Sequence, residues 1–564
     1  MWLLGALTCF AIVPSAHGKL NCPLYGLGYP KPTDLLAQAG IQTVKKLLDT
    51  AFTDNIDNAN QTGSEKFSYS VEVFSADEDD PLWSHHWTAP NLKTLNSTGV
   101  SVVDQDTVYR LGSVTKIFTI LTFLAEVGDT AWNEPITNYI PEIKALVDAD
   151  VDNSHSISTP DWNAITLGSL ASQMSGLARD SEEIPPCGNR PVCNRTQFFE
   201  GIGRLSPSFS SFVTPAYSDI GYTLLAMALE QMTGKLFGAM VQDRIIKPLG
   251  LNHTFYTTPN DSLGIIPGGR YLTNWAFDMG NESPTGNMYT SPSDLSRLGR
   301  AILRSTLLPL AVTRRWLKPV TFSSDPKSSI GSPWGVRQLP LSNSTDSIYQ
   351  FATTFNKAGS LGKYSTFFAI IPEFNIGFSI LAAGEMPAGL ATSVADTLSN
   401  TYLPTMVNIA RIQANETYVG TYINSDPAVN SSMSIVVDRQ APGLSLGSWI
   451  SNGTNLLWYS IALSQNVTKE YWGKILPSAR LYPTGLWDAT SDGGKRVAFK
   501  AVFEDLSLAN ASKPFTTDCS TWVTVAGIVY GSKPLDQFIF NINAVGNVTS
   551  VENAALRNRL DKVV

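Results

Sequence analysis

The sequence has few charged residues, few histidines and no long hydrophobic run. Only 16% of its 564 residues are Asp, Glu, Lys or Arg, 43% are hydrophobic, and the formal net charge is −8. This balance argues against an intrinsically disordered chain, and the negative charge argues against nucleic acid as a partner. We find no low-complexity tract and no repeat of fixed period, and the length favours more than one domain.

Two further absences concern membranes and metals. The most apolar internal stretch, Ile117 to Val127, is too short to span a bilayer, so we expect no stable membrane insertion. The five histidines show no HExxH spacing, and there is no phosphate-binding or dinucleotide-binding glycine fingerprint. The sequence therefore gives no support for a metal site or a nucleotide cofactor.

The first 18 residues are apolar and end in small residues, Ala16 and Gly18. This pattern is typical of a secretory signal peptide cleaved near Gly18. No Lys or Arg precedes this apolar run, so the terminal amine is its only positive charge. A short membrane anchor is therefore the alternative. We expect a secreted, extracellular protein.

Cysteine is scarce as well, with five in the chain, and loss of the leader removes Cys9. The remaining even number suits an oxidising compartment. The turn-forming interior of "CGNRPVC" predicts a local Cys187–Cys193 disulfide, which leaves Cys22 to pair with Cys519. Buried thiols without a partner are the alternative.

Asn-x-Ser/Thr sequons are abundant, and so many in one chain predict a glycosylated, secreted eukaryotic protein. They begin at Asn60, Asn96, Asn194, Asn252, Asn260, Asn281, Asn343, Asn415, Asn430, Asn452, Asn466, Asn510 and Asn547.

Hydrophobic periodicity predicts an α+β domain over residues 19–405. Helices are expected over 32–52, after Ser113, and over 164–176, 216–235, 291–303 and 389–403. Strands are expected over 66–77, 82–90 and 106–112, and on both sides of a turn at 372–375. The first two strands should form a hairpin.

The pattern changes near residue 405, and a second domain is predicted over 406–564. Short alternating segments at 432–439, 455–463 and 496–503 are separated by turn signals. This pattern predicts a small antiparallel β-sandwich or β-barrel.

Ser113 and Lys116 stand where a short strand meets an apolar helix. Residues three apart share a helix face, so the lysine amine would lie beside the serine hydroxyl, a weak nucleophile that needs a nearby base. A helix cap next to a solvated lysine is the alternative. The same spacing at Ser324–Lys327 and Ser360–Lys363 lacks this strand-to-helix context.

Two distant segments add candidate groups. "AYSDIGY" places Tyr217 at the entrance of a second apolar helix, where a phenol can carry protons. "NKAGSLGKY" places Lys357, Gly359 and Ser360 at the start of an apolar strand, where a lysine can bind an anion and a backbone N–H an oxyanion. The alternative for the first segment is an aromatic side chain packed at a domain seam. The alternative for the second segment is a simple glycine turn.

Taken together and in this order, these motifs resemble the penicillin-recognising serine enzymes, which include class C β-lactamases, D-alanyl-D-alanine peptidases and related esterases. The resemblance covers roughly Phe67 to Gly384 and implies a β-lactamase/transpeptidase-like fold. The following segments carry it: "DTVYRLGSVTKIFT", "ITLGSLASQMSGL", "PAYSDIGYTLLAMALE", "KPLGLNHTFY", "GNMYTSPSDLSRLG" and "KAGSLGKYSTFFAIIPE". The last third of the chain resembles the small β-domain of some eukaryotic members.

The resemblance also implies roles for individual residues. Ser113 would be the acylated nucleophile and Lys116 its proton acceptor, with Tyr217 sharing the acid and base work. Lys357 would orient a substrate anion. The N–H groups of Ser113 and Ser360 would form the oxyanion hole, and no metal or organic cofactor is implied.

Two positions depart from the family pattern. Asp219 stands where the tyrosine motif usually has Asn, and a carboxylate beside Lys116 would favour the charged lysine and weaken it as a base. Ala358 stands where penicillin-processing members carry Thr or Ser, so a hydroxyl contact to substrate is lost. Both changes argue against β-lactam hydrolysis and leave acyl transfer from an ester or amide open.

A competing motif, "GLSLG" around Ser445, matches a nucleophile elbow but lies in strand-like sequence. No histidine follows it, since His253 is the last in the chain. We therefore expect a secreted serine hydrolase that acts on a small-molecule or peptide-like ester, lactone or amide through an acyl-enzyme at Ser113. The alternatives are an acyltransferase that uses the same acyl-enzyme and an inactive scaffold that binds peptide or glycan.

Overall fold

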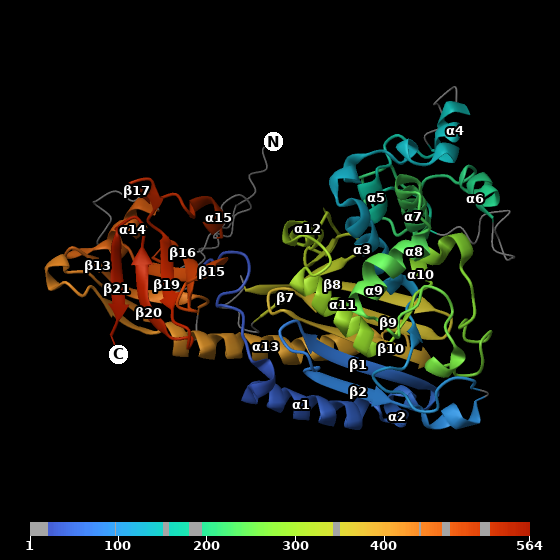
Figure 1. The fold of residues 1–564 in the computed structure, drawn as a ribbon, viewed down its shortest axis with the longest axis horizontal. Coiled ribbons are helices and arrows are strands. Elements are labelled where there is room, and N and C mark those ends of the chain that lie inside the picture. The colour runs from blue at the N-terminus through green and yellow to red at the C-terminus, as the bar shows by residue number, and fades with distance from the viewer. Residues whose placement is uncertain are drawn as a thin grey trace, which may run out of the picture. The chain divides into compact units, whose positions relative to one another are not determined.

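The computed structural model describes residues 21–95, 97–149, 157–179, 194–341, 350–438, 441–464, 474–507 and 519–563. The chain divides into two compact units (Figure 1). The larger unit holds residues 32–339 and 352–409, and the smaller unit holds described parts of 1–31, 340–351 and 410–564. The predicted leader, Cys187, Cys193 and four sequons lie outside the described residues, and those four are at Asn96, Asn343, Asn466 and Asn510.

An eight-stranded antiparallel sheet forms the centre of the larger unit, in the order β2-β1-β10-β9-β8-β7-β6-β5. Its strands are β1 (Phe67–Ser75), β2 (Trp83–Trp87), β5 (Thr321–Phe322), β6 (Ser328–Ile330), β7 (Gly335–Pro340), β8 (Phe351–Leu361), β9 (Tyr364–Ile371) and β10 (Ile376–Gly384). The expected hairpin is confirmed, because β1 pairs with β2 in the register Tyr69↔Trp87. A separate two-stranded ladder joins β3 (Tyr109–Arg110) to β4 (Tyr289–Thr290).

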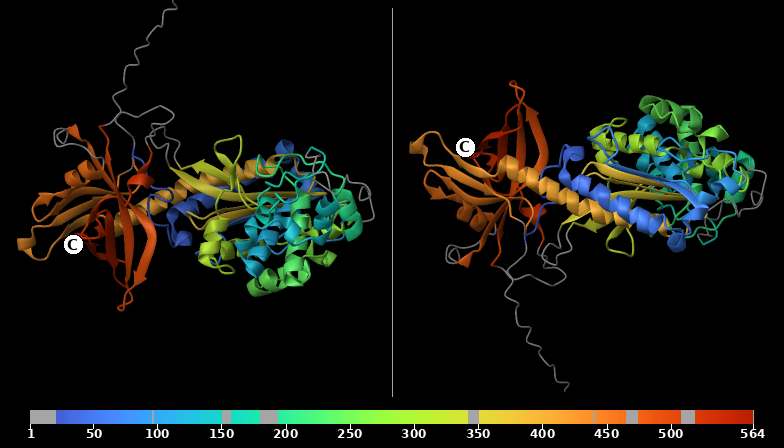
Figure 2. Two further views of the ribbon diagram at one scale, coloured as in Figure 1. Left: turned by 90° about the horizontal axis from the view of Figure 1, so that it is seen from above. Right: turned by 90° about the horizontal axis from the view of Figure 1, so that it is seen from below.

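Helices cover both faces of this sheet, and their bounds are α1 (Ala39–Ala51), α2 (Ala59–Thr62), α3 (Thr115–Val127), α4 (Pro141–Ala149), α5 (Leu167–Ala171), α6 (Arg195–Ile202), α7 (Asp219–Thr233), α8 (Phe237–Val241), α9 (Lys247–Leu249), α10 (Ser283–Gly286), α11 (Pro292–Arg304), α12 (Leu310–Trp316) and α13 (Leu390–Tyr418). Successive side chains of a strand point to opposite faces. On β1, Tyr69 packs against Phe52 at the end of α1, whereas the Phe74 ring lies against Gly299 of α11. Helices α1 and α13 lie side by side (Figure 2).

The structure corrects two helix predictions. The helix expected over 164–176 ends at Ala171, because Gln173 adopts a left-handed backbone (φ 63°). The closing helix expected over 389–403 continues through Pro404 to Tyr418. The predicted boundary at residue 405 therefore lies inside a helix, and the compact units divide between Ile409 and Ala410.

The smaller unit is an antiparallel sheet that closes into a barrel, because β12 pairs with both β11 and β13. Its elements are β11 (Gly420–Ile423), β12 (Ser432–Val436), β13 (Leu444–Ser451), β14 (Thr454–Asn455), α14 (Leu456–Ser464), β15 (Pro477–Ala489), β16 (Lys495–Asp505), α15 (Thr521–Thr524), β17 (Val529–Tyr530), β18 (Lys533–Pro534), β19 (Gln537–Ile542), β20 (Val548–Asn553) and β21 (Asn558–Lys562). A disulfide joins Cys22 to Cys519 within this unit.

One strand prediction in this unit is wrong. Residues 455–463 form helix α14 for most of their length. This helix buries Leu457, Ser460 and Ile461 at helical spacing. Among the described helices, none is both long and apolar enough to cross a membrane.

Candidate active site

Ser113 lies in a tight turn between β3 and the buried helix α3. Gly112 makes this turn possible, because its φ of +52° is a left-handed conformation that other residues rarely adopt. Within the described residues, the Ser113 hydroxyl bonds to two side chains, Lys116 and Tyr217, and caps no helix amide. The helix-cap alternative therefore fails.

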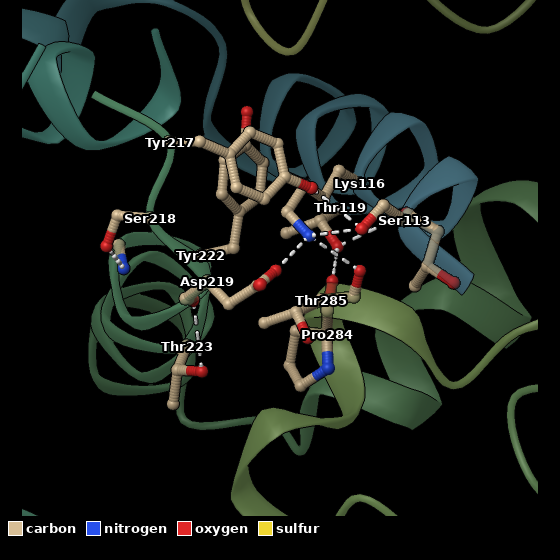
Figure 3. Close-up of polar contacts among 12 residues, drawn as sticks. Ser113, Lys116, Thr119, Tyr217, Ser218, Asp219, Tyr222, Thr223, Pro284 and Thr285 are labelled. Carbon is tan, nitrogen blue, oxygen red and sulfur yellow. Dashed lines mark hydrogen bonds and ion pairs between the residues drawn. The ribbon is translucent and has the colours of Figure 1, made fainter. Parts of the chain in front are cut away.

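The Lys116 amine is completely buried and is surrounded by acceptors (Figure 3). It donates to Ser113 Oγ at 3.1 Å, to the Thr285 carbonyl at 2.9 Å and to Asp219 Oδ1 in a close ion pair. Asp219 and the Thr285 carbonyl only accept, so two N–H bonds of the amine are committed to them. The third substituent position on Lys116 Nζ faces Ser113. It holds a proton when the lysine is an ammonium and a lone pair when the lysine is a neutral amine.

Tyr217 reaches the same hydroxyl from the other side. Its phenol donates to Ser113 Oγ at 2.7 Å (Figure 3). The Nζ atoms of Lys116 and Lys357 each lie 5.1 Å from the centre of its ring, and the Arg179 guanidinium carbon lies 5.4 Å away. Cations at this distance are attracted to the face of an aromatic ring, so Tyr217 links the two lysines.

Lys357 lies on β8 and is only 8% exposed. Its amine donates to the Ala358 carbonyl at 2.7 Å. Burial and, to a smaller extent, the positive charge of Lys116 lower the pKa of Lys357 to about 7, against the opposing effect of the Asp219 carboxylate. Lys357 therefore changes charge near neutral pH.

The Ser113 turn and the Gly359–Ser360 segment of β8 are packed backbone to backbone. A Cβ added to Gly112 would lie 2.7 Å from the Ser360 nitrogen, and a Cβ added to Gly359 would lie 2.9 Å from the Ser113 nitrogen. The two backbone N–H groups expected to form an oxyanion hole thus belong to touching segments. Thr366 secures this contact by donating to the Leu111 carbonyl at 2.7 Å.

Four groups predicted from distant parts of the sequence therefore converge, namely Ser113, Lys116, Tyr217 and Lys357. Asp219 contacts Lys116, as expected from its place in the tyrosine motif. Sequence reasoning missed the Thr285 carbonyl and Arg179. A backbone carbonyl has no residue-type signature, so no motif could have revealed the first, and nothing in the sequence signalled the second.

Asp219→Asn is expected to shift the pH dependence for substrates that carry a carboxylate. Asp219 holds the pKa of Lys357 higher than burial and Lys116 would leave it, so neutralising Asp219 lowers this pKa below about 7. The Lys357 ammonium then survives only at lower pH, and the alkaline fall in kcat/KM moves to lower pH. The shift is measured by comparing the pH profiles of kcat/KM of the variant and the native protein with a carboxylate-bearing ester, and a neutral ester is the control substrate. Identical profiles of the two proteins with the carboxylate-bearing ester would contradict the prediction.

Other candidate sites receive no support. Ser445 lies within β13, paired with Arg480 of β15, and not at a strand–turn–helix corner. In the described part of the chain, no group of three or more His, Cys, Asp or Glu side chains is placed to hold a metal ion.

Two family models match this chain. The β-lactamase family model matches residues 91–399, and a model described as "Beta-lactamase-like-like, C-terminal domain" matches residues 410–564. A β-lactamase-like protein of Arthroderma benhamiae is 27% identical over 99% of this chain and 98% of its own length. A protein of a Phoma species described as a probable hydrolase is 25% identical, covering 76% of this chain and 73% of its own. The D-alanyl-D-alanine-carboxypeptidase/endopeptidase AmpH of Escherichia coli is 26% identical, and the match covers 48% of this chain and 70% of AmpH.

Proposed function

Because the chain belongs to the β-lactamase family, whose relatives are named as hydrolases, we propose that it is a secreted enzyme that cleaves an ester, lactone or amide through an acyl-enzyme on Ser113. One observation carries the proposal. The half-buried hydroxyl of Ser113 lies within hydrogen-bond distance of both a lysine amine and a tyrosine phenol. A serine needs such a partner to become a nucleophile.

In the acylation step, Ser113 Oγ attacks the substrate carbonyl carbon and gives its proton to Tyr217 as phenolate or to Lys116 as neutral amine. The carbonyl oxygen becomes negative and is stabilised by the N–H groups of Ser113 and Ser360. The bond to the leaving group breaks, and that group takes up the proton. Water then attacks the acyl-enzyme by the same route in reverse and releases the acid and Ser113.

The ion pair with Asp219 limits what Lys116 can do. As an ammonium, Lys116 donates to the developing alkoxide and cannot remove the serine proton. The serine proton then passes to Tyr217 in its phenolate form, and the phenolate charge would be stabilised by the two lysines that flank the ring. Lys357 is placed on the strand next to the oxyanion segment, where its charged form would bind a substrate carboxylate.

Ala358 and Asp219 make a β-lactam an unfavourable substrate. Ala358 offers no hydroxyl to a carboxylate next to Lys357, and Asp219 offers no amide N–H to a substrate carbonyl. The better candidates are an ester, a lactone or an amide that does not need these two donors.

Secretion is supported by the apolar start of the chain and by the Cys22–Cys519 disulfide. Disulfides of this kind persist in oxidising compartments.

Labelling with a fluorophosphonate probe tests the nucleophile. The native protein should be labelled and Ser113→Ala should not, while Ser445→Ala is the matched control that keeps full labelling. A screen of ester, lactone, D-amino-acid amide and β-lactam substrates, with Ser113→Ala as the blank, then identifies the reaction. Unchanged labelling of Ser113→Ala would reassign the nucleophile, and absence of labelling in the native protein would favour the binding scaffold.

A further inference from the structure

Gln173 carries two unfavourable features at one buried position. Its backbone is left-handed (φ 63°), which residues other than glycine rarely adopt, and only 6% of the residue is exposed. Its side-chain Nε2 is buried and has no hydrogen-bond partner among the described residues. Strain of this kind persists only where the surrounding structure imposes it, and it gathers at functional sites.

The same residue holds the chain on both sides of Tyr217. The Ala216 N–H donates to the Gln173 carbonyl at 2.8 Å, and the Ser218 N–H donates to Gln173 Oε1 at 2.6 Å. The second bond fixes the orientation of the side-chain amide, because a backbone N–H requires the oxygen and leaves Nε2 turned away. The unpaired nitrogen is thus a consequence of using the oxygen to hold Ser218.

Both bonds also depend on the left-handed turn at Gln173. Had helix α5 continued past Ala171, the carbonyl of residue 173 would serve the helix instead of Ala216. The strained turn directs the main-chain and side-chain oxygens of one residue toward the segment that carries the phenol.

From this arrangement we infer that Gln173 is a positioning residue that holds the Tyr217 phenol against Ser113. The inference rests on the proposed function, in which Tyr217 carries the serine proton. The phenol lies 2.7 Å from Ser113 Oγ. A shift of about 1 Å in such a group typically costs about a hundredfold in rate.

Gln173→Met tests the side-chain oxygen, because methionine keeps the length and removes the acceptor. With p-nitrophenyl acetate, kcat should fall about 10- to 100-fold while KM stays within about twofold. Gln173→Glu keeps an acceptor oxygen and should recover most of the loss. Gln231→Met, on the exposed side of α7, is the matched control and should behave as the native protein.

A Tyr217→Phe background separates positioning from general stability. If Gln173 acts through the phenol, Gln173→Met should change the fluorophosphonate labelling rate of Tyr217→Phe by less than about twofold. The same loss in both backgrounds, or a native kcat in Gln173→Met, would overturn the inference. If Gln173→Met does not fold, Gln173→Gly removes the same oxygen while allowing the left-handed turn, and the same outcomes apply.

The two proposals can fail separately. Labelling that survives Ser113→Ala would refute the proposed function. Labelling that is lost in Ser113→Ala but is unaffected by Gln173→Met would refute only the role of Gln173.

Discussion

Gly359→Ala is expected to lower kcat/KM by at least about a thousandfold, because the added methyl group separates the nucleophile turn from strand β8. Its Cβ would lie 2.1 Å from the Leu111 carbonyl oxygen, 2.5 Å from Thr366 Oγ1 and 2.9 Å from the Ser113 nitrogen. Two of these atoms belong to the backbone that carries Ser113. They cannot yield without moving the serine and both backbone N–H groups of the proposed oxyanion hole.

The same substitution should also lower stability, by about 1–3 kcal/mol for overpacking at a buried position. Gly221→Ala is the matched control, because a Cβ there meets its nearest atoms at 3.6 Å and lies in helix α7. Steady-state kinetics and thermal unfolding of both variants measure the difference. Native kcat/KM and an unchanged melting temperature for Gly359→Ala would show that the Ser113 turn and β8 do not pack as described.

The sequence predicted the elements around the site because their signals are local. Helix α3 coincides with a run of apolar residues. Helices α7 and α11 begin directly after Ser218 and Ser291, and each of these serines caps its helix through its side chain. Strand β1 was predictable from the alternation of apolar and polar residues over most of Phe67–Ser75. The four converging groups could be named because each sits in a short motif beside such an element.

Other elements were decided by contacts distant in sequence. Residues 455–463 are apolar at most positions, so periodicity alone does not distinguish a strand from a helix. In the structure they form α14, which buries Leu457, Ser460 and Ile461. Helix α5 stops early because Gln173 bonds to residues more than forty positions away. Neither outcome is encoded within a window of ten residues.

The Thr285 carbonyl and the bracing of Tyr217 by Gln173 form another group that sequence could not reveal. Any residue supplies a backbone carbonyl, so its use depends on the path of the chain. The side chain of Gln173 is ordinary in type, and only its left-handed backbone and buried amide set it apart. Motifs therefore predicted the four converging groups but not the contacts that hold them in place.

Lys357→Met is expected to stabilise the protein and to weaken its action on anionic substrates. The pKa of Lys357 falls from 10.5 to about 7, mainly because burial disfavours the charged amine. Each pKa unit corresponds to about 1.4 kcal/mol, so burial of this amine costs roughly 5 kcal/mol below pH 7. Loss of the hydrogen bond to the Ala358 carbonyl returns about 1 kcal/mol, which leaves a gain of about 4 kcal/mol.

The pH dependence gives this prediction its sign. Between pH 7 and 10.5 the unfolded protein binds a proton at Lys357 that the folded protein does not, so the stability of the native protein rises with pH across that range. The advantage of Lys357→Met is therefore complete below pH 7 and disappears toward pH 10.5. Denaturant unfolding of both proteins at pH 6 and pH 10 measures it, and a variant less stable than the native protein at pH 6 would contradict the prediction.

Activity should change in the opposite direction, because the same charge that destabilises the fold would bind the substrate. Lys357→Met should lower kcat/KM for a carboxylate-bearing ester about a hundredfold and for a neutral ester less than about tenfold. Lys357→Arg keeps a cation on β8 and should retain part of the preference for the anionic ester. Equal losses on both esters would mean that Lys357 serves the proton network around Tyr217 and not the substrate anion.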